Sequence, residues 1–129
     1  MAKATMGPMP GAEIRTYRGE GGALTRGTAV MQGTAQDQVK APTGANVRPA
    51  GIVAETTAAA GDPVAVVRRG ECIAIAGGAV NPGDYVEITG VNGRLTATVT
   101  GGHEVVGRAV SAAAADGDEF VIDVHPLLY

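Results

Sequence analysis

Apolar and polar residues alternate over short stretches of this chain, and Gly or Pro separates one stretch from the next. Residues 85–89 and 94–100 both alternate in this way, and they flank Asn92 and Gly93. Asn-Gly favours the tight turn of a β-hairpin, and alternation with a period of two is typical of a half-buried strand. The pattern therefore predicts an antiparallel hairpin over residues 85–100.

Other short stretches, each bounded by Gly, Pro or Asp, predict further strands. From residue 71 to 76, Cys and Ala occupy one face of the predicted strand and Ile73 and Ile75 the other. We expect the isoleucine face to be the core face, and we expect a turn at Arg69-Gly70 just before it. The expected strands are residues 28–32, 52–55, 64–68, 71–76, 105–112 and 119–124.

Helices are not favoured anywhere. The alanine-rich stretches 58–60 and 112–115 are compatible with one helical turn each, but both are too short for a stable helix. Twenty Gly and seven Pro in 129 residues suit short strands joined by turns. The sequence predicts an all-β fold, a small β-barrel or β-tulip-like domain.

Several landmarks of the chain recur at an offset of 56 residues. Chance similarity is one explanation in a chain rich in Gly and Ala, and an internal duplication is the other. A duplication predicts two similar β-units that share one core. The matching landmarks are Gly22 with Gly78, Gly51 with Gly107, Gly61-Asp62 with Gly117-Asp118, and Val66 with Ile122.

The apolar content is carried by small side chains. Apolar residues make up 45% of the chain, but Trp is absent, Phe occurs once and Tyr three times. Small side chains bury little area each, at about 25 cal/mol per Å². A chain of this length forms one domain, and its thin core favours an oligomer that buries more surface between subunits.

Charge, aromatic content and cysteine content disfavour several classes of protein. The formal net charge is −3 without a basic stripe, so nucleic-acid binding has no electrostatic basis. The shortage of aromatic residues also disfavours single-strand and sugar binding. No apolar run is long enough to span a membrane, and the single Cys72 cannot form an internal disulfide.

Candidate chemistry is sparse. His103 and His125 have no nucleophile or metal ligands at a recognisable spacing, and Cys72 lies in an apolar stretch that would raise its pKa. The aspartates that follow Gly are better explained as turn residues that accept hydrogen bonds from backbone amides. We expect no catalytic residue, no metal and no cofactor.

The first 20 residues differ from the rest of the chain. Gly7-Pro8-Met9-Pro10-Gly11 cannot continue a helix or lie inside a sheet. We expect residues 1–20 to be an extended arm and residues 21–129 to be a single β domain. Adaptable apolar groups and guanidinium groups in the arm suit binding to a partner; the candidate residues are Met6, Pro8, Met9, Pro10, Arg15, Tyr17 and Arg18.

The ordered set of Gly-punctuated motifs resembles the capsid cement, or head decoration, proteins of tailed bacteriophages. The resemblance covers roughly residues 20 to 125, in the family's order. It rests on the segments 27–30 (GTAV), 49–53 (PAGIV), 61–66 (GDPVAV), 83–86 (GDYV), 106–110 (VGRAV) and 117–122 (GDEFVI).

This resemblance implies a homotrimer of compact β-barrels that binds the outer surface of a phage head. The implied partner is the major capsid protein, and the implied role is to stabilise the shell of the virion after assembly in the host cytoplasm. The family has no catalytic residues. Its N-terminal arm contacts the capsid, which maps onto residues 1–20 here.

Two other classes remain as alternatives. A trimeric β-clip nucleotide hydrolase is also small and rich in Gly turns, but this chain lacks the Gly-rich C-terminal phosphate-covering motif and ends in Pro-Leu-Leu-Tyr. A virion-surface receptor- or glycan-binding module is the other, and the aromatic shortage weakens it. Phosphate release from deoxynucleotides and glycan binding would identify them.

Overall fold

The computed structural model describes residues 12–98 and 101–128, and over these residues the fold contains strands and no helix. The predicted all-β class is confirmed. The nine strands are β1 (Glu13–Glu20), β2 (Ala29–Gln32), β3 (Gln38–Lys40), β4 (Gly51–Val53), β5 (Pro63–Ile75), β6 (Tyr85–Ile88), β7 (Leu95–Ala97), β8 (Glu104–Ala109) and β9 (Glu119–Leu128).

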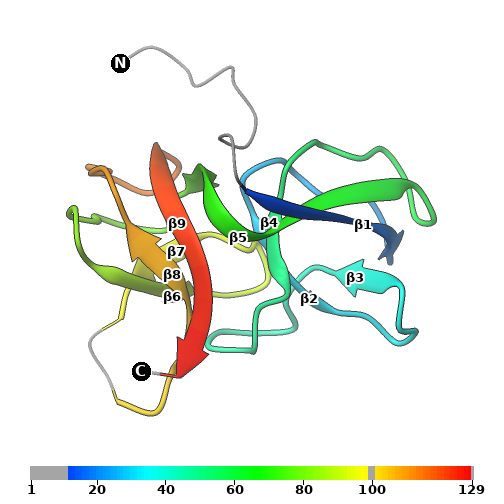
Figure 1. Cartoon of the computed structure of the whole chain (residues 1–129), viewed down its shortest axis with the longest axis horizontal. Coiled ribbons are helices and arrows are strands. Elements are labelled where there is room, and N and C mark those ends of the chain that lie inside the picture. Colours follow the sequence, from blue (N-terminus) through cyan, green and yellow to red (C-terminus); the bar gives the residue numbers. More distant parts are fainter. Residues whose placement is uncertain (1–11, 99–100, 129) are drawn as a thin grey trace.

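The first five strands close into a small barrel. Their order is β1-β3-β2-β4-β5, and β1 pairs again with β5 to complete the circle. The pair β1–β3 is parallel and the other pairs are antiparallel. In Figure 1 this barrel lies on the right, with β1 crossing β5.

The last four strands and the second half of β5 form a similar unit beside it (Figure 1). Their order is β5-β9-β8-β6-β7, and a parallel bridge between Ala76 and Leu95 returns β7 to the end of β5. The hairpin predicted around Asn92-Gly93 is confirmed as the antiparallel pair β6–β7.

The two units have the same strand pairing at an offset of 56 residues. Ala29 pairs with Ile52 in the first unit, and Tyr85 pairs with Arg108 in the second. Met31–Lys40 and Ile52–Val67 recur in the same way as Glu87–Thr96 and Arg108–Asp123. Equal register across three ladders supports a duplicated β-unit over chance similarity of Gly-rich turns.

The Gly-Asp turns also match between the units. Asp62 Oδ2 accepts hydrogen bonds from the amides of Ala58 and Ala59, at 3.1 and 3.0 Å. Asp118 Oδ2 accepts the equivalent bonds from Ala114 and Ala115, at 3.2 and 3.0 Å. These carboxylates close turns, as the sequence predicted, and the alanine-rich stretches before them are loops.

Replacing Asp118 by Ala is expected to lower the free energy of unfolding by about 1 kcal/mol, because two amides lose a charged acceptor. Urea denaturation of the two proteins measures this loss. Asp37→Ala is the matched control, since the Asp37 carboxylate is 66% exposed and has only a 3.9 Å ion pair with Arg18. A loss at Asp37 equal to that at Asp118 would contradict the capping role.

The expected turn at Arg69-Gly70 is wrong, because β5 runs without interruption from Pro63 to Ile75. The strand changes partners there instead: residues up to Arg69 pair with β1, and Gly70 onward pair with β9. Gly70 has a φ of +100°, which permits the bend between the two units.

The expected isoleucine core face of β5 is only partly confirmed. Ile73 is buried, at 6% exposure, but Ile75 is only partly buried, and the larger buried cluster takes Cys72, Ala74 and Ala76 from the other face. Phe120 lies beside Ala74 in the ladder and belongs to the same cluster. Bulky side chains from β9 therefore fill this interior, and β5 contributes small ones.

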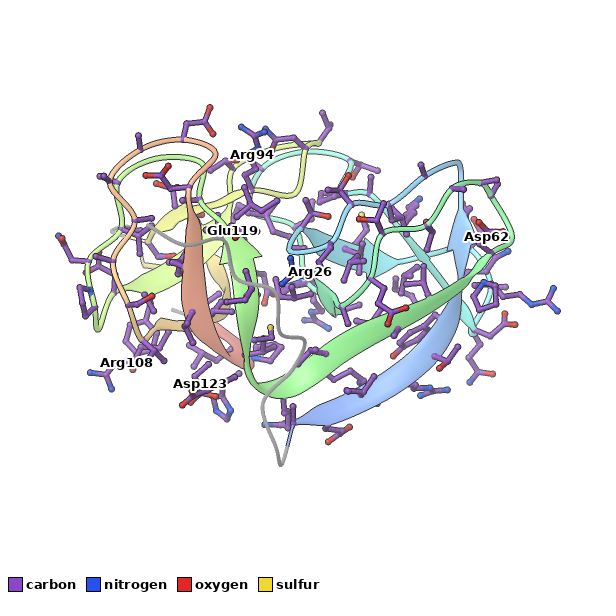
Figure 2. All side chains as sticks on the ribbon, turned by 90° about the horizontal axis from the view of Figure 1, so that it is seen from above. Arg26, Asp62, Arg94, Arg108, Glu119 and Asp123 are labelled. Atoms are coloured by element: carbon purple, nitrogen blue, oxygen red, sulfur yellow. The ribbon has the colours of Figure 1, made fainter. Side chains whose placement is uncertain are left out.

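Two buried clusters stabilise the molecule. The smaller lies inside the first barrel; its members are Tyr17, Leu24, Val30, Val39, Val53, Val64 and Val66. The larger fills the second unit and also takes in Ala29, Ile52 and Val67 from the first. An ion pair between Arg26 and Glu119, 3.6 Å long, joins the units as well (Figure 2).

The segment expected as an arm is partly in the barrel. Glu13–Glu20 forms β1, paired with both β3 and β5, so the structure differs from a domain that starts at residue 21. Residues 1–11 lie outside the described part. The alternation of apolar and polar residues in β1 is hard to recognise in the sequence. Tyr17 is the apolar residue of one face, and its neighbours on that face, Arg15 and Gly19, are not apolar side chains.

Candidate functional site

Cys72 is a packing residue of the core. Its side chain is 3% exposed, and burial, the largest cause, raises the pKa of the thiol to about 12. Nearby Asp123 raises this pKa further, and Arg26 opposes both. A thiol that stays protonated at neutral pH is a poor nucleophile.

Native protein is therefore expected to be inert to a thiol reagent at pH 8 and to react once unfolded in urea. The variant Val110→Cys in a Cys72→Ala background is the control, because Val110 is 47% exposed and its replacement should react at once. The pKa of Cys72 is higher in the folded protein than in the unfolded chain. The contribution of this protonated thiol to the free energy of unfolding is therefore complete below about pH 9 and is lost as the pH rises toward 12. Rapid labelling of the native thiol would contradict its burial.

Each histidine ring contacts one charged side chain. His103 Nδ1 lies 2.7 Å from Glu87 Oε2, and His125 Nδ1 lies 3.0 Å from Arg69 Nη1. Over residues 12–98 and 101–128, no group of three or more His, Cys, Asp and Glu side chains is placed to hold a metal ion. The same residues include no helix that is long and apolar enough to cross a membrane.

The candidate arm residues fall into three groups. Met6, Pro8, Met9 and Pro10 lie outside the described residues. Tyr17 is 6% exposed and its ring packs in the first barrel, with the Arg15 guanidinium 5.1 Å from the ring centre. Arg15 and Arg18 are exposed on β1, and Arg18 lies 3.9 Å from the Asp37 carboxylate.

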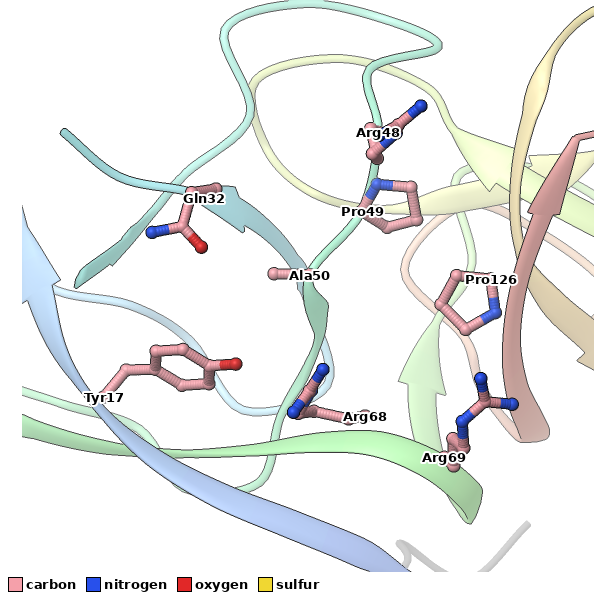
Figure 3. A pocket seen from close by; sticks show the side chains of 8 residues that line it. All are labelled: Tyr17, Gln32, Arg48, Pro49, Ala50, Arg68, Arg69 and Pro126. Carbon is pink, nitrogen blue, oxygen red and sulfur yellow. The ribbon is translucent and has the colours of Figure 1, made fainter. Parts of the chain in front are cut away.

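A cationic pocket of about 290 Å³ opens between the first barrel and the end of β9. The hydroxyl group of Tyr17 faces this space from one side, and the guanidinium groups of Arg68 and Arg69 border it from β5 (Figure 3). The full lining is Tyr17, Gln32, Arg48, Pro49, Ala50, Arg68, Arg69 and Pro126. We call this the arginine pocket.

An irregularity in the β1–β5 ladder explains why two successive arginines border one pocket. Glu13 pairs with Arg69 and Ile14 with Val67, so Arg68 is the extra residue of a β-bulge. A bulge redirects side chains that would otherwise point to opposite faces. Sequence patterns did not predict this pocket. The one sequence feature that pointed to it was the adjacent pair Arg68-Arg69 in a chain with only 10 Lys and Arg.

Comparisons with known proteins agree with this fold. A family model described as phage cement protein matches residues 9–125. Among solved structures, the chain is similar to the N base of head fiber gp8.5 of bacteriophage phi29, with a TM-score of 0.67 and 20% identity over 88% of this chain and 93% of that one. No curated protein matches this sequence.

Proposed function

This chain belongs to the phage cement protein family and has a structural role in association with a phage capsid, and on that premise we propose that it decorates the outer surface of the head and stabilises the shell. The family match over residues 9–125 is the observation that carries this proposal. The similar phi29 protein is the base of a head fiber, and a head fiber is likewise a part of a phage head.

The proposed partner is the major capsid protein, bound by a homotrimer. Most side chains in the two buried clusters are Val and Ala, and one Phe is among them. Such cores stabilise weakly, so burial of further surface between subunits would help. Exposed Ile14, Val91 and Val110 are candidates for that surface, at 49, 65 and 47% exposure.

In this proposal, the segment before β1 reaches the capsid, with Met6, Pro8, Met9 and Pro10 as contacts and with Arg15 and Arg18 beside it. Three such segments on one trimer would act together, because the first contact raises the effective concentration of the others. A modest affinity at each contact then gives lasting attachment. Tyr17 would support this surface from inside the barrel.

A non-catalytic role is part of the proposal. The aspartates of the Gly-Asp turns are occupied with backbone amides, and Cys72 is buried with a raised pKa. The phage cement family is structural. Absence of phosphate release from deoxynucleotides would agree with this role, and steady release would favour the nucleotide hydrolase.

Sedimentation with undecorated phage capsids, together with light scattering of the free protein, tests the function. The expected results are a solution mass near three times the 12.9 kDa chain and saturable co-sedimentation with capsids. Capsids already decorated serve as the control and should take up no further protein. A protein that ignores undecorated capsids would overturn the proposal.

A further inference from the structure

The arginine pocket concentrates positive charge on a molecule that is negative as a whole. The chain has 10 Lys and Arg against 13 Asp and Glu, yet Arg48, Arg68 and Arg69 all line this one cavity. Guanidinium groups gathered around one cavity attract an anion more strongly than scattered surface cations do. The pocket is therefore more positive than the chain as a whole.

Nearby carboxylates leave much of this positive charge unused. Arg68 is 3.6 Å from Glu13, and Arg48 is 3.5 Å from Glu104. Both contacts are long, and Arg48, Arg68 and Glu13 are exposed to solvent, so each pair contributes little. The remaining arginine, Arg69, has the His125 ring nitrogen as its polar contact, which is not a carboxylate.

The other lining groups suit an extended peptide. Pro49 and Pro126 give the walls apolar surface, and the Tyr17 hydroxyl offers a hydrogen-bond donor from the opposite side (Figure 3). A volume of about 290 Å³ holds a side chain rather than a folded element. Guanidinium forks bind carboxylates through two parallel hydrogen bonds.

We propose that the arginine pocket binds a carboxylate side chain from an extended acidic segment of a partner protein. In the virion that partner is a capsid subunit, a step that rests on the proposed function. A nucleic acid fits less well, because a single pocket on a chain with a net charge of −3 provides no extended basic track for a continuous phosphate backbone.

The test uses the full chain and a fluorescently labelled hexaglutamate peptide, with hexaglutamine as the neutral comparison. Hexaglutamate is expected to bind and hexaglutamine is not. The double variant Arg68→Gln/Arg69→Gln should weaken hexaglutamate binding at least tenfold. The matched double variant Arg94→Gln/Arg108→Gln removes the same charge elsewhere on the molecule (Figure 2) and should weaken it less than twofold.

A single variant protects the test against loss of folding. Arg48 is 84% exposed, so Arg48→Gln should keep the melting temperature while it weakens peptide binding about threefold or more. The proposal is overturned if hexaglutamate does not bind, if the two double variants lose equal affinity, or if a hexathymidine oligonucleotide binds more tightly through the same arginines.

Capsid sedimentation separates this inference from the proposed function. Capsids that bind the unaltered protein and the Arg68→Gln/Arg69→Gln variant equally would overturn the pocket as a capsid contact and leave the cement role intact. Hexaglutamate binding that depends on the arginines, without capsid attachment, would support the pocket and overturn the cement role.

Discussion

Gly107→Ala is expected to leave the protein unfolded or barely stable, with a loss of about 3 to 5 kcal/mol in the free energy of unfolding. Gly107 lies in β8 beside β9, where a methyl group would overlap the carbonyl oxygen of Asp123 and lie 3.0 Å from Cα of Val124. These are backbone atoms of a central ladder, so only separation of the strands can make room. Total stabilities of about 5 to 15 kcal/mol leave little reserve.

Urea denaturation followed by far-ultraviolet circular dichroism measures this loss. Gly51→Ala should behave alike, because its methyl group would overlap the carbonyl oxygen of Val67 at the matching place in the first barrel. The control is Gly90→Ala, which has no atom within 4 Å of the added carbon and should stay within about 0.5 kcal/mol. A Gly107→Ala protein as stable as this control would show that β8 and β9 are not so close.

Removal of residues 2–20 is expected to destroy the first barrel, whereas removal of residues 2–11 should leave it folded. β1 closes the barrel by pairing with β3 on one edge and β5 on the other, and it carries Tyr17 into the core. Without it, the first half of β5 has an unpaired edge and the cluster loses its largest side chain. In the protein without residues 2–20, backbone amides of β2, β3 and β4 should exchange their hydrogens rapidly.

The protein without residues 2–11 is the control for this cut and also tests the arm. It should melt within a few degrees of the full chain and bind capsids much more weakly. Full capsid binding would remove Met6, Pro8, Met9 and Pro10 from the proposed contact. A stable first barrel in the chain that starts at residue 21 would contradict the place of β1 in the fold.

Local patterns predicted most of the second unit and part of the first. Asn92-Gly93 correctly predicted the β6–β7 hairpin. The Gly-Asp turns were recognised because an aspartate at a turn usually accepts hydrogen bonds from nearby backbone amides. The 56-residue offset between Gly51 and Gly107 marked a real structural equivalence, since both positions need the absence of a side chain.

The rest depended on contacts between distant parts of the chain. β1 pairs with β5, some fifty residues later, and no sequence feature of Glu13–Glu20 identifies β5 as its partner. The core face of β5 was only partly predicted, because the prediction used side-chain size alone. Phe120 lies beside Ala74 in the ladder, and the small side chain of Ala74 leaves room for it in the core. The arginine pocket arises from a bulge that two successive arginines share, and a regular strand pattern gives no sign of it.

The shared strand β5 has a consequence for synthesis on the ribosome. The nascent chain can close its first barrel once β5 has emerged, but residues 70–75 pair in the sheet with β9, which is made after β6, β7 and β8. During synthesis of the second unit this strand edge is open, and open edges are templates for pairing with other chains. Chains that stop before Glu119 are therefore expected to aggregate rather than persist as a soluble half-molecule.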